Sequence, residues 1–378
     1  MRSGVRRAAC VNAPIHHFLA TLAAFVLVSP AQAAERTPQA AIYPPVLPGY
    51  TLSFPRDEGA HPDFRTEWWY LTGWLETAHG DPLGFQITFF RSRPGVDEGN
   101  PSRFAARQLL FAHVAISDPQ RGVLLRDEKA AREGFGIAAA KQGELGVHID
   151  DWVLRREGDH YVAFIQAREF ALEVDLMRTQ PVLLQGDRGF SQKGPEVGAA
   201  SYYYSQPQLA TSGRLAIGGR EHRVTGVSWF DHEWSSSIMD ESASGWDWLG
   251  LNLDDGGALM VFRMRNESGG EHWAAATSRA EADALPVRRV YSGGEIDWTP
   301  LRYWRSARTG VRYPIEWKIS VGERTITLKP LMDDQENDAR GSTGTLYWEG
   351  AVRAFDDQGQ QVGRGYLELT GYGSRLRF

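Results

Sequence analysis

Two carboxylates and a histidine lie between tryptophans in one short segment, "VTGVSWFDHEWS", residues 224–235. If this segment is a β-strand, side-chain alternation places Trp229, Asp231 and Glu233 on one face and the interleaved residues on the other. Burial among aromatic rings raises the pKa of a carboxyl group, and a neighbouring carboxylate pushes it the same way. We therefore predict a neutral Asp231 that can donate a proton or a hydrogen bond. The alternative is an ionised Asp231 satisfied by an arginine or by backbone amides.

Other familiar catalytic signatures are absent from the sequence. Ser228 lacks the second glycine of a nucleophile elbow, and four residues after His232 stands Ser236 instead of the second histidine of a zincin motif. The remaining histidines show no ligand spacing, and no glycine-rich phosphate loop joins a strand to a helix. We expect neither a metal nor a cofactor.

Aromatic side chains crowd the strand-like segments, and a few polar residues are threaded among them. Convergent polar groups in an apolar concavity are typical of a small-molecule site, which we expect in the first half of the chain. The expected ligand-binding residues are Glu67, Trp69, Gln86, Tyr203, Tyr204, Gln206 and Glu233. If Tyr202 to Tyr204 form a strand, Tyr203 opposes its two neighbours, but alternation alone does not say which face lines the pocket. Plain core packing is the alternative for each aromatic residue.

The elements that must position these residues are β-strands. Helical periodicity is scarce, and most apolar segments are short and bounded by Gly, Asp and Asn turn signals. Residues 67–93 read as a hairpin that turns at 79–82, and residues 147–177 read as three strands with breaks at 157–159 and 168–169. The sequence predicts an all-β fold of antiparallel strands.

A weak internal repeat divides the chain. Trp68-x-Tyr70-Leu71-x-x-x-Leu75 is echoed by Trp246-x-Trp248-Leu249-x-x-x-Leu253, and Gly226-x-x-Trp229-x-Asp231 is echoed by Gly363-x-x-Tyr366-x-Glu368. We expect two related β-domains, residues 61–238 and 239–378, after an extended lead-in at 34–60 that is rich in proline. Chance similarity among hairpins is the alternative.

The first 33 residues have the layout of a secretory signal peptide: three arginines, an apolar run of about a dozen residues and a small-residue cleavage site after Ala33. The mature chain is expected in the periplasm or outside the cell. It has no transmembrane segment, because no later apolar run approaches the roughly 18 residues that a span needs. Cys10 leaves with the leader, so no disulfide and no thiolate nucleophile are expected.

Charge argues against a nucleic-acid partner. The chain has 41 basic and 47 acidic residues, and the leader removes three arginines and no acid, which leaves 38 against 47 and a net charge of −9. A nucleic-acid-binding protein needs a basic face, and the sequence has no lysine- and arginine-rich block.

Five motifs resemble the carotenoid 1,2-hydratase family in its exported, lipocalin-like branch, often called AttH-like. They are "EWWYLTG", "GFQITFFR", "YYYSQPQL", "GVSWFDHEW" and "GYLELTGY", in that order between about His61 and Tyr372. The resemblance implies two lipocalin-like β-barrel domains. It also implies Asp231 as a proton donor and Trp229 as the aromatic residue beside it, here tryptophan where the hydratases have tyrosine. Many exported relatives are linked with transport systems of the ATP-binding-cassette (ABC) type.

Two functions follow as hypotheses. In the first, the protein binds an apolar or lipid-like small molecule and passes it to or from components of an ABC transporter. In the second, it is a hydro-lyase that uses Asp231 to protonate an alkene. A purely structural role, in which aromatic side chains fill the pocket, is a third possibility. Fold alone does not separate them, because function lies in sites.

Overall fold

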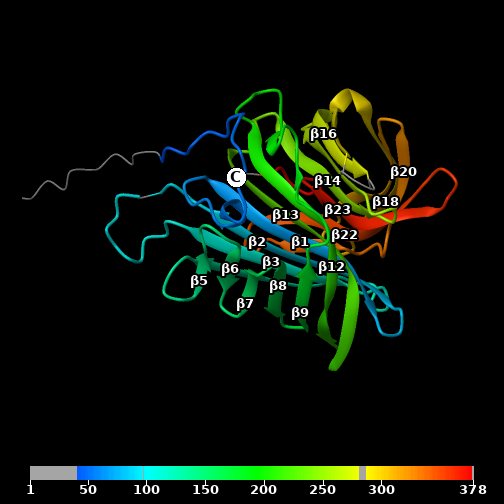
Figure 1. The fold of residues 1–378 in the computed structure, drawn as a ribbon, viewed down its shortest axis with the longest axis horizontal. Helices are drawn as coiled ribbons and strands as arrows, with labels where there is room; N and C mark the ends of the chain where they lie inside the picture. The colour runs from blue at the N-terminus through cyan, green and yellow to red at the C-terminus, as the bar shows by residue number, and fades with distance from the viewer. Residues whose placement is uncertain (1–40, 97, 281–286, 377–378) are drawn as a thin grey trace, which may run out of the picture. The chain divides into compact units, whose positions relative to one another are not determined.

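Antiparallel β-strands build almost all of the regular structure, as the sequence predicted. The computed structural model describes residues 41–96, 98–280 and 287–376, which belong to one compact unit, Ala40–Phe378 (Figure 1). Within those ranges the helical elements are two short 3₁₀ turns, η1 (Arg56–Glu58) and η2 (Gly293–Glu295). The predicted signal peptide lies outside the described residues. The all-β, tandem lipocalin-like prediction is confirmed by two barrel-like sheets.

The first sheet curls until it is nearly closed. In the described part of the chain it has thirteen strands: β1 (Thr66–Thr77), β2 (Pro82–Ser92), β3 (Leu109–Ser117), β4 (Leu125–Arg132), β5 (Ala138–Ala140), β6 (Gly146–Ile149), β7 (Trp152–Glu157), β8 (His160–Gln166), β9 (Phe170–Met177), β10 (Leu183–Leu184), β11 (Phe190–Gln192), β12 (Ala200–Ile217) and β13 (Arg220–Ser237). The strand order is β4-β3-β2-β1-β13-β12-β9-β8-β7-β6-β5, with β10 and β11 paired to β12. Strands β3 and β4 at one end contact β6 near the other end.

The second sheet forms a half-barrel. Its ten strands among the described residues are β14 (Ala243–Leu253), β15 (Ala258–Asn266), β16 (Glu271–Ala280), β17 (Val287–Ser292), β18 (Ile296–Arg305), β19 (Arg312–Val321), β20 (Arg324–Pro330), β21 (Glu336–Ala339), β22 (Thr345–Phe355) and β23 (Gln361–Thr370). The order is β17-β16-β15-β14-β23-β22-β20-β19-β18, with β21 paired to β22.

Turn signals in the sequence located the hairpin between β1 and β2 and two of the turns between β6 and β9. The hairpin between β1 and β2 turns at residues 78–81, close to the predicted turn. Residues 146–177 form four strands where three were predicted, because a further turn falls at Asp150, whose φ of 51° is left-handed. Asp tolerates that conformation, so the Asp150-Asp151 pair was a turn signal. It was overlooked because the residues around it alternate as in a strand.

The internal repeat has a matching strand register. Gly226 of β13 pairs with Leu75 of β1, and Gly363 of β23 pairs with Leu253 of β14. Asp231 pairs with Tyr70, and its counterpart Glu368 pairs with Trp248. The two sequence echoes therefore describe the same strand pairing in each sheet.

The lead-in fills part of the interior of the first sheet. Val46, Leu52 and Ala60 belong to the same apolar core as the inward side chains of the sheet. Glu58 is also buried, where Arg156 and Arg178 pair with its two oxygens at 3.0 and 3.1 Å. A buried carboxylate needs such partners, because leaving one unpaired costs several kcal/mol (roughly 3–5).

A separate apolar core lies where the outer face of the first sheet packs on the second sheet. Trp74, Tyr203 and Trp229 from one side meet Trp248 and Phe262 from the other. The Trp74 indole donates a hydrogen bond to the Gly365 carbonyl at 3.0 Å. The two sheets thus share an interior of their own.

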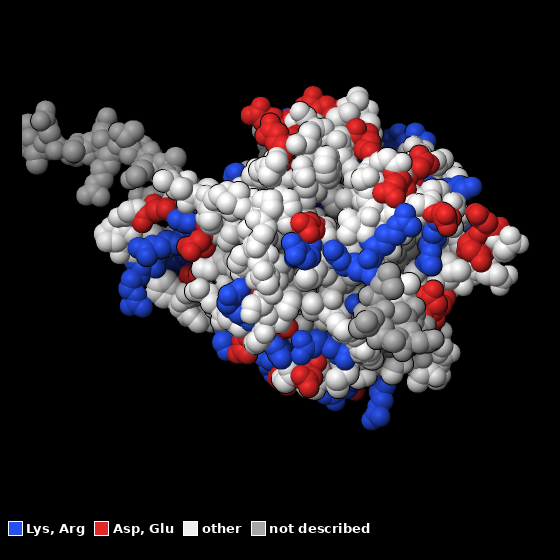
Figure 2. Space-filling view, turned by 45° about the horizontal axis from the view of Figure 1, so that its top comes forward, with Lys and Arg blue, Asp and Glu red and all other residues white. Residues whose placement is uncertain are grey.

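No helix in the described ranges has the length and apolar character to cross a membrane. On the face drawn in Figure 2, basic side chains lie close to acidic ones and do not gather into one broad basic area.

We predict that Gly226→Ala destabilises the protein by about 3 kcal/mol, the upper end of the usual range for overpacking. A Cβ at this position would lie 1.8 Å from the Trp74 carbonyl oxygen, which is backbone and cannot rotate away. Chemical denaturation measures the change. Gly294→Ala is the control, since a Cβ there meets nothing within 4 Å, and it should stay within about 0.5 kcal/mol of the native protein. Equal stabilities for the two variants would contradict the register.

Candidate functional site

A cavity lies between the two sheets, lined by the outward face of the first sheet. Paired residues of an antiparallel sheet share a face, so Tyr70 and Tyr203, which pair with Asp231 and Glu233, point the same way as those acids. The second sheet closes the cavity with Trp248 and other residues. The full lining is Thr66, Trp68, Tyr70, Thr88, Phe90, Lys193, Tyr203, Asp231, Glu233, Ile238, Trp246, Trp248, Phe262, Met264, Tyr347, Glu349 and Glu368.

Asp231 is the most closely held acid in the cavity. Ser205 Oγ and Trp229 Nε1 donate to its Oδ1 at 2.5 and 2.7 Å, and the Tyr203 hydroxyl donates to its Oδ2 at 2.7 Å. The Tyr203 oxygen accepts a hydrogen bond from Trp248 Nε1 at 3.0 Å, which turns its own proton toward Asp231. Gln185 holds the Ser205 hydroxyl in the same way, at 2.7 Å.

Burial and hydrogen bonding act on Asp231 in opposite directions. Desolvation raises its pKa, the three donors lower it, and the charge of Glu233 raises it, with a pKa of about 7 as the result. Because Oδ1 has two donors and Oδ2 has one, the proton of the neutral acid belongs on Oδ2. Asp231 is therefore an acid poised near neutral pH, and no cation among the described residues pairs with it.

Glu233, unlike Asp231, is paired with a cation. Lys193, from the segment between β11 and β12, places Nζ 2.9 Å from Glu233 Oε1. Ser201 also donates to that oxygen. The Lys193 ammonium lies over the rings of Tyr203 and Phe262, 4.7 and 4.1 Å from their centroids. Lys193 thus pairs with Glu233 and not with Asp231, two residues away on the same face.

The second sheet contributes two more acids, Glu349 and Glu368. They are direct partners in the register of β22 and β23. Burial raises the pKa of Glu368 to about 7, although Trp246 donates to its Oε2 at 2.8 Å. Burial and the neighbouring Glu368 charge raise the pKa of Glu349 well above its ordinary value.

Some of the site residues proposed from the sequence lie at the cavity, and others do not. Asp231, Glu233 and Tyr203 line the cavity, while Trp229 stands behind Asp231 as a hydrogen-bond donor. Gln86 lies one layer away, donating to the cavity residue Thr88 at 2.6 Å.

Four other proposed residues lie elsewhere. Glu67, Trp69 and Tyr204 face the interior of the first sheet, and Gln206 donates to the Gln180 carbonyl at 2.6 Å. The cavity is thus not inside the first domain, where the sequence analysis placed it. The physical reason is that the lead-in and its ion pairs occupy that interior.

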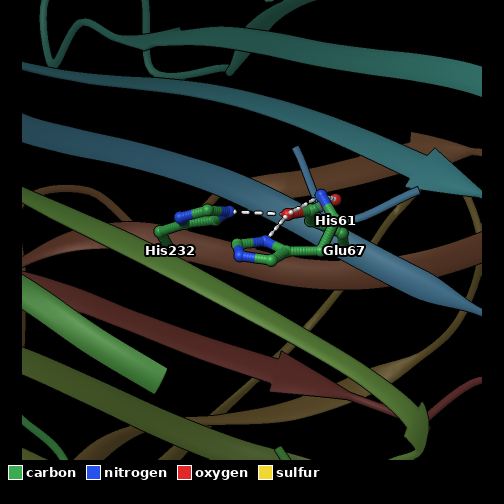
Figure 3. A group of neighbouring side chains, drawn as sticks. All are labelled: His61, Glu67 and His232. Carbon is green, nitrogen blue, oxygen red and sulfur yellow. Dashed lines mark hydrogen bonds and ion pairs between the residues drawn. The ribbon is translucent and has the colours of Figure 1, made fainter. Parts of the chain in front are cut away.

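Glu67 instead joins two histidines in a buried polar cluster. His61 Nδ1 and His232 Nε2 lie 2.7 and 2.9 Å from its Oε1, and Figure 3 shows both rings directed at this carboxylate. Burial would raise the pKa of Glu67, but the charge of Arg91, 2.7 Å from Oε2, and both histidines hold it well below its usual range.

This cluster offers one possible ligand atom each from His61, Glu67 and His232, all within 4.8 Å of one another. A metal ion would have to compete with the Arg91 guanidinium for the same carboxylate. His232 Nδ1 also bonds the Asp57 carbonyl oxygen at 3.0 Å. The contacts fit a network that fixes the lead-in to the sheet.

Sequence reasoning missed Lys193, Glu349 and the position of Ser205. Glu368 carried a signal, because the repeat aligns it with Asp231. Lys193 carried none, since its place in the cavity depends on how the segment before β12 folds back.

Fold and cavity together define a tandem lipocalin-like protein with a buried acid at the contact of its two sheets. The AttH-like family model matches residues 45–372, and the chain belongs to that family. A crystal structure assigned to AttH of Nitrosomonas europaea is 50% identical, with a TM-score of 0.81 over 87% of this chain and 99% of that one. Kievitone hydratase of Nectria haematococca shares the fold at 15% identity and a TM-score of 0.66, over 89% and 98% of the two chains. No curated protein sequence matches the chain.

We predict that Asp231 makes the protein less stable as the pH rises. Its folded pKa of about 7 exceeds its ordinary value of 3.8, so the native state binds more protons between these values and loses stability as the pH rises through them. Asp231→Asn removes this contribution. Relative to that variant, the native protein should lose on the order of 4 kcal/mol between about pH 4 and pH 8, measured by urea unfolding.

The control for this titration is Asp297→Asn, at an exposed position on β18. Its stability should follow that of the native protein at every pH. If Asp231→Asn also runs parallel to the native protein, Asp231 is ionised throughout and the raised pKa is wrong.

Proposed function

We propose that the protein binds an apolar or lipid-like small molecule in the cavity between its sheets, with Asp231 as the polar group that orients it. The observation that carries this proposal is the cavity itself, which combines aromatic walls with an acid held by three donors. A ligand oxygen near Asp231 Oδ2 would accept the proton of the neutral acid.

We place the mouth of the cavity where its lining meets a surface groove. Thr66 and Ile238 line both the cavity and a surface groove that continues along Ser236 to Glu241. A chain-like ligand could enter there with its polar end leading. We further propose that the protein is exported and passes its ligand to or from a membrane transport system of the ABC type, as the family resemblance implies.

A second candidate function is hydration of an alkene, which the poised acid favours. Asp231 Oδ2–H would give its proton to one alkene carbon, water would add to the resulting cation, and a proton from that water would return to Asp231. Alkene and water thus combine into an alcohol. Trp248, whose ring lines the cavity, is better placed than Trp229 to stabilise the cation. Kievitone hydratase, with the same fold, is named for a hydration.

We predict unequal effects on ligand affinity for two neighbouring tyrosines. Tyr203→Ala should weaken binding of a neutral apolar fluorophore, N-phenyl-1-naphthylamine, by about tenfold, because it removes a wall of the cavity. Tyr204→Ala is the matched control. This substitution leaves a void in the core inside the first sheet. The free energy of unfolding should therefore fall by about 3–5 kcal/mol, while the affinity of the folded protein for the fluorophore stays the same. Equal losses of affinity would place the ligand elsewhere.

Asp231→Asn separates carrier from hydratase. Acyclic isoprenoid alkenes are incubated with each protein in ¹⁸O-water, and mass spectrometry detects labelled alcohol. A hydratase forms the alcohol with the native protein and not with the variant, whereas a carrier forms none with either and binds through both. Alcohol formation by the variant would exclude Asp231 as the proton donor.

A further inference from the structure

Carboxyl groups outnumber cations in the cavity. Among the described lining residues, the acids are Asp231, Glu233, Glu349 and Glu368, and the one cation is Lys193. Lys193 is already paired with Glu233. Asp231 and Glu349, which are buried, and Glu368, which is half-buried, therefore face the cavity without a positive partner among the described residues. This arrangement is costly unless the acids are neutral or a ligand brings the charge.

Glu349 shows most clearly that a partner is missing. It is 4% exposed, and its Oε1 has no hydrogen-bond partner among the described residues. The hydroxyl of Tyr70, on the opposite sheet, is also buried without a partner at hydrogen-bond distance, although it lies near enough to lower the pKa of the Glu349 carboxyl. Native structures satisfy nearly all such groups with protein or water partners, so this oxygen is open to accept a hydrogen bond from a donor inside the cavity.

The walls suit a positive charge as well. Trp246, Trp248 and Phe90 are among the rings that line the cavity, and aromatic faces attract ammonium groups most strongly when water is excluded. Lys193 already demonstrates this in the same space, with its ammonium between a carboxylate and two rings.

We propose that the cavity binds a protonated primary amine on an apolar tail, with the ammonium donating to Glu349 and lying beside Glu368. This inference rests on the proposed ligand-binding function and names the chemical class of the ligand. The tail would run past Trp246 toward the mouth at Thr66 and Ile238, where the cavity meets the surface groove.

Binding of such a ligand should release protons. Burial raises the pKa of Glu349, of Glu368 and of Asp231, so these acids hold protons in the empty cavity near neutral pH. Among the described residues, the other titratable groups around them are Glu233 and Lys193, which pair with each other, Asp247, and the hydroxyls of Tyr70, Tyr203, Tyr347 and Tyr366. An ammonium favours the ionised acids, whereas a neutral ligand does not.

The test compares three probes with the same ten-carbon tail: decylammonium, 1-decanol and decanoate. Isothermal titration calorimetry at about pH 7, in two buffers of different ionisation enthalpy, gives both affinity and protons released. We expect decylammonium to bind about tenfold more tightly than decanol and to release protons, decanol to release none, and decanoate to bind worst. Glu349→Gln should remove most of the preference for decylammonium over decanol.

A surface variant, Glu323→Gln, serves as the control and should behave as the native protein does. If decanol binds as tightly as decylammonium, or if decanoate binds best, the amine proposal is overturned and the apolar ligand site stands. If the preference for the amine survives Glu349→Gln, the ammonium site is not the one proposed. If no probe binds, the proposed ligand-binding function itself fails.

Discussion

Strand β13 serves two interiors at once, and the rest of the structure depends on this constraint. Alternation sends Phe230, His232 and Trp234 into the core of the first sheet and Asp231 and Glu233 toward the second sheet. A shift of one residue in its pairing would exchange the two sets. The acids would then face the apolar core of the first sheet, and the aromatic residues would face the cavity. The pairing of β13 with β1 and with β12 therefore decides both which residues hold the lead-in and which face the cavity.

The first interior is closed by charge and packing together. The lead-in brings Asp57 and Glu58 into the sheet, and Arg156, Arg178 and the His232 ring meet them there. Removing one partner of such a pair would leave a buried charge, which costs about 3–5 kcal/mol. A ligand would have to displace the lead-in to enter this space. In the second interior, between the sheets, one acid is paired with a cation and the other three are not. We therefore prefer this interior as the ligand site.

Sequence reasoning predicted the features that follow from local pattern. The faces of β13 and the all-β class both depend on alternation and turn residues within short segments. The location of the cavity could not be predicted, because it depends on where the lead-in packs, and its contacts with Arg156 and Arg178 join residues about a hundred positions apart. The sequence also did not decide which face of the sheet Tyr203 occupies, because its pairing with Glu233 on another strand determines that face.

An anomalous-scattering experiment can locate the ligand site. Crystals soaked with a neutral brominated apolar probe, 1-bromodecane, would be measured at the bromine absorption edge. We expect a bromine peak between the sheets, among Trp246, Trp248 and Asp231. A peak inside the first sheet, beside Glu58 and Tyr161, would contradict it and restore the lumen of the first sheet as the ligand site.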